Sequence, residues 1–333
     1  MVSANAARRL IQHYVDNFRQ LPWRSPPGEP PPEPYRVWLS EVMLQQTTVA
    51  TVAPRFERFI ERWPSLDALA AADEGEILGE WAGLGYYSRA RNLIRCAREL
   101  AARGGFPSTA AELRNLPGIG SYTSGAIAAI AFGERAPAID TNIKRVIGRL
   151  EGLRSPRLAQ IERKLLGMME TEKPGDLVQA LMDLGATICR PKQARCSICP
   201  LNSDCAAQKS GDPQAYPDPP RRKRRPHRYG TAWWIERDEQ VWLVRRPPTG
   251  LLGGMAALPG SNWSDEPAGS GQALAVIRHV FTHFSLDLAV EQRPEPLAEG
   301  WWHPIASLDK AGLPTLYLKA ARETLRRKGS IAS

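Results

Sequence analysis

Residues 113–145 read LRNLPGIGSYTSGAIAAIAFGERAPAIDTNIKR, a pattern typical of two helices joined by a glycine hairpin. Gly118 and Gly120 permit a tight turn and a close backbone approach to a ligand, because glycine carries no side chain. The next helix is predicted to start near Ser121, and the unpaired backbone N–H groups at such a start form a site for an anion. In a chain of net charge +9, a nucleic-acid phosphate is the natural anion. The glycine hairpin alone is equally explained as a plain turn between two helices that binds no ligand.

Asp140 stands twenty residues after Gly120, behind an apolar pair and just before a second predicted helix. Taken by itself, an aspartate in this position is best explained as an N-cap, whose carboxylate accepts a hydrogen bond from a backbone N–H of the helix. An N-cap does not account for its combination with the glycine hairpin. Its role therefore depends on the rest of the chain.

The composition is that of a globular protein with an anionic partner. The 333 residues suffice for one large or two medium domains, and 43% of them are hydrophobic. A sequence pI of about 9.5 adds a modest signal for nucleic acid. We find no apolar run long enough to span a membrane and no signal-peptide core at the N-terminus. Prolines cluster at 22–34 and 213–226, which predicts an internal loop and a linker.

The first part of the chain is predicted to be mainly helical. Apolar residues recur there with helical spacing, and the pattern is interrupted by a Pro-rich loop at 25–34 that cannot be helical. The predicted helices cover 4–18, about 35–47, three stretches within 54–103, one stretch from near Ser121, and further stretches within 141–188.

Glu41 lies among apolar residues of the helix predicted at 35–47. A glutamate on a helix usually faces solvent, but Gln45 and Gln46 at the end of the same apolar segment weaken that interpretation. Two adjacent amides carry donors and acceptors that suit base edges or backbone polar groups. A solvated last helical turn explains the two glutamines equally well.

A second pair of glycines, Gly83 and Gly85, predicts a turn between two helices. This turn would project Leu84 and Tyr86. On a basic protein, an apolar or aromatic side chain on an exposed turn can wedge into a stack of bases. The alternative is that Leu84 and Tyr86 pack on the core.

Four cysteines form the most specific local motif. Their spacing is C-x6-C-x2-C-x5-C, at Cys189, Cys196, Cys199 and Cys205. Disulfides are disfavoured in a chain without a secretory signal, and zinc sites usually combine two C-x2-C pairs where this chain has one. Four thiolates within 17 residues after a helix suit a cubane iron–sulfur cluster.

The composition changes between residues 206 and 228, where Pro, Asp and a run of Arg and Lys replace the helical pattern. This stretch is typical of a linker, and its basic run either tracks DNA or is solvated without an ordered role. Short alternating strands and a last helix at about 315–327 follow, which predict a separate α+β domain. The predicted strands cover 229–235, 240–245, 276–282, 286–290 and 297–302.

Nearly the whole chain resembles the A/G-specific adenine DNA glycosylases, the MutY type, of the helix-hairpin-helix or endonuclease III superfamily. The motifs that carry the resemblance are WLSEVMLQQT at 38–47, GLGYY at 83–87, LPGIG at 116–120, Asp140 and the four cysteines. The resemblance implies a mainly α glycosylase domain at 1–210, which includes an iron–sulfur cluster loop at 189–205. A basic Pro-rich linker at 211–228 and a smaller, Nudix-like α+β domain at 229–330 would complete the chain.

The resemblance also implies a cofactor and a lesion-reading loop. The four cysteines would hold a 4Fe–4S cluster. The C-terminal domain lacks the Arg-Glu and Glu-Glu pairs of the Nudix catalytic pattern, which implies recognition rather than hydrolysis. In the family a loop of Phe, Ser and His reads 8-oxoguanine, and Phe281-Thr282-His283 matches it here. Threonine keeps the hydroxyl but adds a methyl group, which would shift or weaken the base contact.

The implied activity is release of adenine paired with 8-oxoguanine or guanine in double-stranded DNA. The protein would be a monomer without membrane contact, located in the bacterial cytoplasm and held at the nucleoid by DNA. Protonated Glu41 would donate to N7 of a flipped adenine, and ionised Asp140 would stabilise the positive charge on the sugar. The resemblance places supporting residues at Tyr122 and Asn142, the adenine pocket at Trp23 and Arg24, and DNA contacts at Gln46, Leu84, Tyr86, Gly118 and Gly120.

Tyr122 separates this type from the bifunctional lyases of the superfamily. Those enzymes carry a Schiff-base lysine two residues after the last hairpin glycine, where this chain has Tyr122. We therefore expect a monofunctional glycosylase. Thr141 departs from this pattern, because the family usually has glycine there and threonine is closer to the thymine-glycol branch. A thymine-glycol lyase and a catalytically silent module that marks lesions are the alternatives, and the presence of both Glu41 and Asp140 argues against the silent module.

Overall fold

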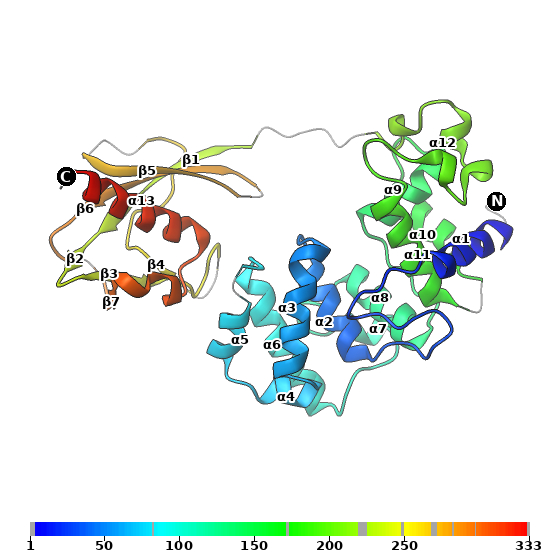
Figure 1. Cartoon of the computed structure of the whole chain (residues 1–333), viewed down its shortest axis with the longest axis horizontal. Helices are drawn as coiled ribbons and strands as arrows, with labels where there is room; N and C mark the ends of the chain where they lie inside the picture. The colour runs from blue at the N-terminus through cyan, green and yellow to red at the C-terminus, as the bar shows by residue number, and fades with distance from the viewer. Residues whose placement is uncertain are drawn as a thin grey trace. The chain divides into compact units, whose positions relative to one another are not determined.

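The computed structural model describes residues 4–81, 83–170, 173–218, 225–247, 250–267, 272–281, 283–296 and 298–331. The chain divides into two compact units, a helical one within residues 1–220 and one with strands within residues 221–333 (Figure 1). Each unit has its own hydrophobic core. In the described part of the chain, no helix combines the length and the apolar character that a membrane span requires.

Helices make up most of the first unit, which confirms the predicted fold class. Three single turns of 3-10 helix accompany them, at Cys196–Ile198, Asn202–Asp204 and Pro213–Ala215. The α-helices are α1 (Ala4–Asp16), α2 (Pro34–Leu44), α3 (Val49–Arg62), α4 (Leu66–Ala71), α5 (Glu74–Glu80), α6 (Tyr87–Ala102), α7 (Ala110–Leu113), α8 (Ser121–Phe132), α9 (Thr141–Leu150), α10 (Leu158–Met168), α11 (Pro174–Thr187) and α12 (Ala206–Lys209).

The helices of this unit differ from the prediction in several places, and two of the differences have a clear local cause. The region 54–103 holds parts of four helices rather than three, because Ser65 and Asp73 each cap a new helix start by accepting a backbone N–H. The helices that they begin, α4 and α5, are too short to show an apolar period. α2 ends at Leu44 instead of continuing to Thr47, since Gln46 adopts a left-handed φ of 56°.

α8 is the buried centre of the helical unit. Its residues from Thr123 to Ala131 are buried, and it packs against both α2 and α11. Gly125 lets the segment that leads into α9 approach α8 closely, because a Cβ there would lie only 2.4 Å from the carbonyl oxygen of Pro137. The starts of α8 and α9 are thereby held close to α2 and α11.

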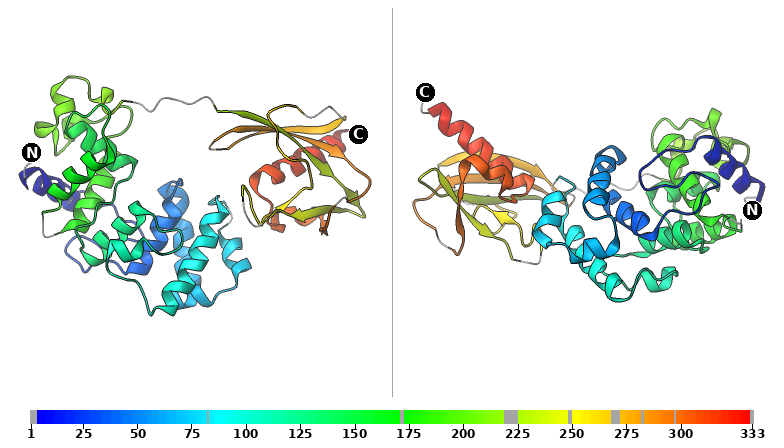
Figure 2. Two further views of the ribbon diagram at one scale, coloured as in Figure 1. Left: turned by 180° about the vertical axis from the view of Figure 1, so that it is seen from behind. Right: turned by 60° about the horizontal axis from the view of Figure 1, so that its bottom comes forward.

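In its described residues, the second unit contains two small sheets, a 3-10 segment at Ile305–Lys310 and one long helix. In one sheet the strand order is β1-β6-β5, with β1 parallel and β5 antiparallel to β6. In the other sheet β3 pairs antiparallel with β2, β4 and β7. α13 (Thr315–Ile331) packs against β5 (Figure 2). The strands are β1 (His227–Trp234), β2 (Glu236–Arg237), β3 (Gln240–Arg245), β4 (Ala256–Ala257), β5 (Ala273–Val280), β6 (Ser285–Gln292) and β7 (Trp301–Pro304).

The α+β character of this unit is confirmed, and several of its strand boundaries are corrected. The strand predicted at 276–282 is β5, which begins earlier and ends at Val280, and the one predicted at 297–302 is β7. Residues 282 and 297 lie outside the described residues. β2 and β4 were not predicted, because two residues are too few for an alternating pattern.

Candidate active site

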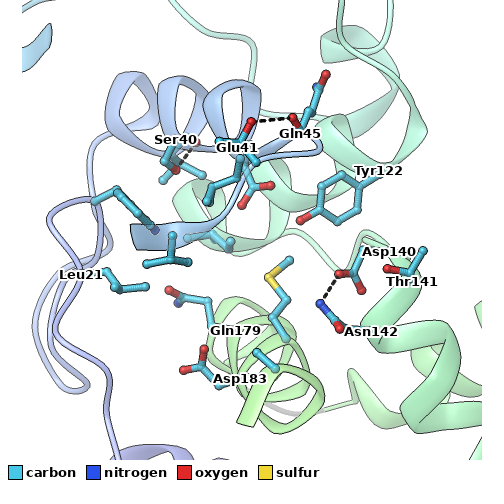
Figure 3. A pocket seen from close by; sticks show the side chains of 18 of the residues that line it. Leu21, Ser40, Glu41, Gln45, Tyr122, Asp140, Thr141, Asn142, Gln179 and Asp183 are labelled. Carbon is cyan, nitrogen blue, oxygen red and sulfur yellow. Dashed lines mark hydrogen bonds between the residues drawn. The ribbon is translucent and has the colours of Figure 1, made fainter. Parts of the chain in front are cut away.

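A cavity of about 770 Å³ opens where α2, α8, α9 and α11 meet. The loop before α2 and the starts of α8 and α9 complete its wall (Figure 3). This cavity brings together predicted site residues from distant parts of the helical unit. They are Trp23, Arg24, Glu41, Gln46, Tyr122, Asp140 and Asn142.

Glu41 is buried on α2, with 7% of its surface exposed. Burial raises the pKa of its carboxyl from 4.5 to about 7. A hydrogen bond with Tyr122 lowers this pKa, the nearby Asp140 raises it, and the charge of Arg24 lowers it. A large fraction of Glu41 therefore carries a proton at neutral pH, so this group can act as an acid there.

Tyr122 is the second residue of α8 and forms a hydrogen bond with Glu41. Burial, and then the charges of Glu41 and Asp140, raise the pKa of its phenol well above the ordinary value of 10. The hydroxyl therefore stays protonated at neutral pH. It acts as the donor toward ionised Glu41 and fixes the direction of that carboxyl.

Asp140 is the N-cap of α9 and lines the same cavity (Figure 3). Its Oδ1 accepts a hydrogen bond from the Ile143 N–H at 2.6 Å, and its Oδ2 accepts one from Nδ2 of Asn142 at 2.9 Å. Burial raises the pKa of this carboxyl, whereas the hydrogen bonds and the charge of Arg145 lower it. The Asp140 side chain thus caps α9 and also lines the cavity.

Arg145 connects Asn142 to the start of the cysteine loop, and the sequence pattern had not singled it out. Its Nη2 donates to Asn142 Oδ1 at 2.8 Å and to the Gly185 carbonyl at 2.7 Å. Its Nε donates to the carbonyl of Cys189 at 2.8 Å. Asn142 is therefore held at both ends of its amide, by Asp140 and by Arg145. The available signal is that Arg145 follows Asn142 by three residues on one helix face.

Two polar residues of α11 also line the cavity without having been predicted. Gln179 is 6% exposed and Asp183 is 9% exposed. They stand one helical turn apart on a largely apolar helix, which is the sequence signal that would have found them. Asp183 pairs with Arg24, and the neighbouring Trp23 is buried with its ring edge-on to Phe56 at 5.4 Å.

The turn at Leu84 differs from the expected wedge. Leu84 is buried, with 4% exposed, whereas Tyr86 is 47% exposed. Arg89 explains the difference, since its Nη2 donates to the Leu84 carbonyl and its Nη1 to the Val42 carbonyl, both at 2.8 Å. The turn is thereby held against the end of α2. Leu84 packs on the core, and its side chain does not project from the turn.

The glycine hairpin lies between α7 and α8. Gly118 has a φ of +76°, and a Cβ there would lie 2.7 Å from Cβ of Asn92, so both its conformation and its surroundings require glycine. Gly120 is the N-cap of α8, and both glycines are exposed. Gln46 is exposed as well, at the mouth of the cavity.

The four cysteines line one small cavity beside α9, together with Arg149. Arg149 Nη1 lies 3.4 Å from Sγ of Cys189 and donates to the carbonyl of Arg190 at 2.7 Å. Within the described ranges, no three Cys, His, Asp or Glu side chains are close enough together to hold one metal ion. Four thiols around one small cavity are a donor set that suits a metal centre.

Of the predicted lesion-reading residues, Phe281 and His283 lie in a turn of the second unit. Phe281 stacks on Trp263 with ring centroids 5.6 Å apart, and its ring lies 4.8 Å from that of Phe284. The N–H of Phe281 donates to the carbonyl of Phe284 at 2.8 Å, which closes the turn. His283 is exposed, and Thr282 lies outside the described residues.

Two protein-family models match the chain. Residues 39–170 match the HhH-GPD superfamily of base excision DNA repair proteins, and residues 231–323 match the NUDIX domain. The first match includes Glu41, Tyr122 and Asp140 of the cavity and the glycine hairpin, whereas the part of the cavity on α11 lies outside it. The second begins within β1 and ends about halfway along α13.

Curated relatives are adenine DNA glycosylases. The protein of Mus musculus is 34% identical over 367 residues, which covers 87% of this chain and 71% of the relative. That of Homo sapiens is 34% identical over 327 residues, 81% of this chain and 60% of the relative. That of Mycobacterium tuberculosis is 37% identical over 220 residues, 64% of this chain and 70% of the relative. This chain thus spans 60% of the length of the human protein.

Solved structures share the fold of the helical unit. A thermostable thymine-DNA glycosylase aligns with a TM-score of 0.53 and 26% identity, over 61% of this chain and 95% of that chain. Endonuclease III in a non-covalent complex with DNA aligns with a TM-score of 0.52 and 24% identity, over 63% of this chain and 99% of that chain, a likeness of fold alone. With the identity and coverage that it shares with the mouse relative, this chain belongs to the adenine DNA glycosylase family of the HhH-GPD superfamily.

Proposed function

We propose that this protein is a monofunctional DNA glycosylase that removes adenine paired with 8-oxoguanine or guanine in double-stranded DNA. The proposal rests on the cavity that holds Glu41, with a pKa near 7, beside Asp140, whose oxygens accept hydrogen bonds from Ile143 and Asn142. Two carboxyls in different environments can serve one reaction as acid and as charge stabiliser. Membership of the family supports adenine as the base that is removed.

The first step turns adenine into a good leaving group. The base must leave the duplex stack to reach a cavity between helices. Adenine departs slowly as an anion, but it departs readily as a neutral base once its N7 is protonated. Protonated Glu41 supplies this proton, and the Tyr122 hydroxyl holds the carboxyl in place.

In the second step the positive charge on the sugar is stabilised and then removed by addition of water. Cleavage of the C1′–N9 bond leaves the electron pair on the base and positive charge on the sugar. Ionised Asp140 stabilises this charge electrostatically. Water then adds at C1′ and gives its proton to the Glu41 carboxylate. The products are free adenine and an abasic site, and the acid is restored.

The absence of lyase activity is part of the proposal. Tyr122 provides no amine where the lyases of the superfamily carry one, and Lys144, which also lines the cavity, is exposed on α9 as suits a phosphate contact. Borohydride added during the reaction is expected to trap no protein–DNA adduct. A trapped adduct would favour a lyase, with Lys144 as the first candidate for the nucleophile.

Base release under single-turnover conditions tests the glycosylase proposal directly. Three duplexes are compared, in which adenine stands opposite 8-oxoguanine, guanine or thymine. We expect release of adenine from the duplexes with 8-oxoguanine and guanine, and not from the one with thymine. A protein that binds these duplexes but releases no base would be a module that marks lesions.

We also propose that Cys189, Cys196, Cys199 and Cys205 hold a 4Fe–4S cluster. When bound, the cluster would supply four iron–thiolate bonds that fix the loop 189–205. Arg149 and Arg145 already donate to carbonyls at the start of this loop, so its conformation is set from α9 as well. An ordered loop with basic side chains on its surface would contribute phosphate contacts.

The isolated protein is therefore expected to be brown, with broad visible absorbance from thiolate-to-iron charge transfer and about four irons per chain. Replacement of Cys199 by Ser should reduce both signals, because one ligand is lost. Replacement of Cys96 by Ser, a buried cysteine on α6, is the matched control and should leave both unchanged. A colourless, zinc-containing and fully active preparation would contradict the cluster.

Recognition of 8-oxoguanine is assigned to the turn with Phe281, Thr282 and His283. The stack of Phe281 on Trp263 supports this assignment, because it fixes the turn while His283 stays exposed. A test fragment should end after Asp218, since the carbonyl of Tyr216 accepts from Arg149 Nε at 2.8 Å. The fragment then keeps the cavity, the hairpin and the cysteine loop.

The fragment 1–218 is expected to release adenine opposite guanine but to lose roughly ten- to hundredfold of its preference for 8-oxoguanine, because a base contact contributes about 1–3 kcal/mol of discrimination. The full-length double variant Thr282→Ala, His283→Ala should change the preference in the same direction. Single-turnover rates on both duplexes at one salt concentration measure it. Full preference in the fragment would place recognition within residues 1–218, with Gln46 and Tyr86 as the next candidates.

A further inference from the structure

Asp183 is a buried carboxylate without a role in the proposed mechanism. Its Oδ2 accepts a hydrogen bond from Arg24 Nη1 at 2.6 Å, and its Oδ1 accepts from Arg24 Nη2 at 3.0 Å and from Arg19 Nη1 at 2.9 Å. The Arg24 side chain is itself only 7% exposed. One carboxylate therefore holds two guanidinium groups, and the two-point pairing fixes the plane as well as the position of Arg24.

These side chains form part of the cavity wall. Asp183 stands one helical turn after Gln179 on α11, and both lie across the cavity from Glu41 (Figure 3). The charged and titratable groups that line the cavity come from every element that forms its wall. They are Arg19 and Arg24 before α2, Glu41 on α2, Tyr122 on α8, Asp140 and Lys144 at the start of α9, and Asp183 on α11.

The charge of Arg24 acts on the acid as well as on Asp183. It lowers the pKa of Glu41 and that of Tyr122. A buried guanidinium without a paired carboxylate would be attracted to Glu41 and Asp140 and would favour their ionised forms. Pairing with Asp183 offsets this charge and keeps it on the α11 side of the cavity.

We propose that Asp183 is a positioning residue for adenine release, because it holds Arg24 and Arg19 at α11 and prevents them from pairing with Glu41. This inference rests on the proposed function, in which Glu41 must carry a proton. Asp183 touches the base in no step. Its effect reaches the reaction through the two arginines.

The pH dependence of single-turnover adenine release tests this role, on a duplex with adenine opposite 8-oxoguanine. The rate falls as pH rises through the pKa of Glu41, so the midpoint of the fall reports that pKa. In Asp183→Asn the charge of Arg24 is no longer offset, and the midpoint is expected to move to lower pH by roughly half a unit to one unit. In Arg24→Gln it should move to higher pH, and the double variant should return near the wild-type midpoint.

If the proposal is correct, the pH midpoint shifts in opposite directions in Asp183→Asn and Arg24→Gln. A mere loss of packing would instead lower the rate by the same factor at every pH. Asp176→Asn, the same exchange on α11 outside the cavity, is the matched control and should keep the wild-type midpoint. An unchanged midpoint in Asp183→Asn would overturn the proposal. If that variant does not fold, Asp183→Ser replaces it, and failure of both to fold would assign Asp183 to the framework and also overturn the proposal. Wild-type protein that releases no adenine would instead refute the proposed function.

Discussion

Glu41→Gln is expected to lower single-turnover adenine release by at least about 10³-fold, within the range for loss of a general acid. The amide has nearly the shape of the carboxyl but cannot give up a proton. Lesion-containing DNA should still bind, because the change leaves the surface of the protein unaltered. Release by the wild type should be fastest below pH 7 and should fall as pH rises through the pKa of about 7, since only protonated Glu41 donates.

Glu57→Gln is the matched control for this exchange, because Glu57 is exposed on α3 and lies outside the cavity. Its rate and pH profile should equal those of the wild type. Near-normal release by Glu41→Gln would move the acid to another group in the cavity, with Tyr122 as the nearest candidate.

Asp140→Asn is expected to lower release by roughly 10²–10³-fold, the size of effect seen when one electrostatic contact to a transition state is removed. The asparagine oxygen can still accept the Ile143 N–H, so α9 should keep its cap and the melting temperature should change little. Single-turnover release at pH 7 and a thermal melt measure the two effects separately.

Asp73→Asn makes the same change at the N-cap of α5, which lies outside the cavity. It should leave release unaffected, and it therefore separates loss of a charge in the cavity from a change of cap. Release by Asp140→Asn within a few fold of the wild type would assign charge stabilisation to a different carboxylate.

Features that depend on neighbouring residues could be predicted from the sequence. Gly118 and Gly120 indicated the hairpin, Asp140 indicated the start of α9, and the change of pattern after residue 228 indicated a unit with strands. Each of these signals acts within a few residues, where backbone conformation and capping decide the outcome. The fold class followed from them, whereas the family was inferred from the resemblance of several motifs, which include residues 38–47 and the four cysteines.

Features that depend on distant partners could not be predicted. Asp183 pairs with Arg24 across 159 positions, and Arg145 bonds to Cys189 across 44. The sequence places Asp183 on a largely apolar helix and Arg145 three residues after Asn142, but it does not show which distant residue either one pairs with. The sequence left open whether Leu84 projects or packs on the core, because its burial depends on the bonds that Arg89 makes to α2 and to the turn.

Burial of Glu41 also has a consequence for the stability of the helical unit. Its pKa is about 7 in the folded protein against 4.5 for an exposed carboxyl, so the folded state resists its ionisation. The free energy of unfolding therefore falls as pH rises from about 4.5 through 7, by about 3 kcal/mol from this residue alone. Domains are commonly stable by only about 5–15 kcal/mol. Above about pH 8 this loss is complete, so the acid proposed for adenine release makes the folded unit less stable at neutral and alkaline pH than in mild acid.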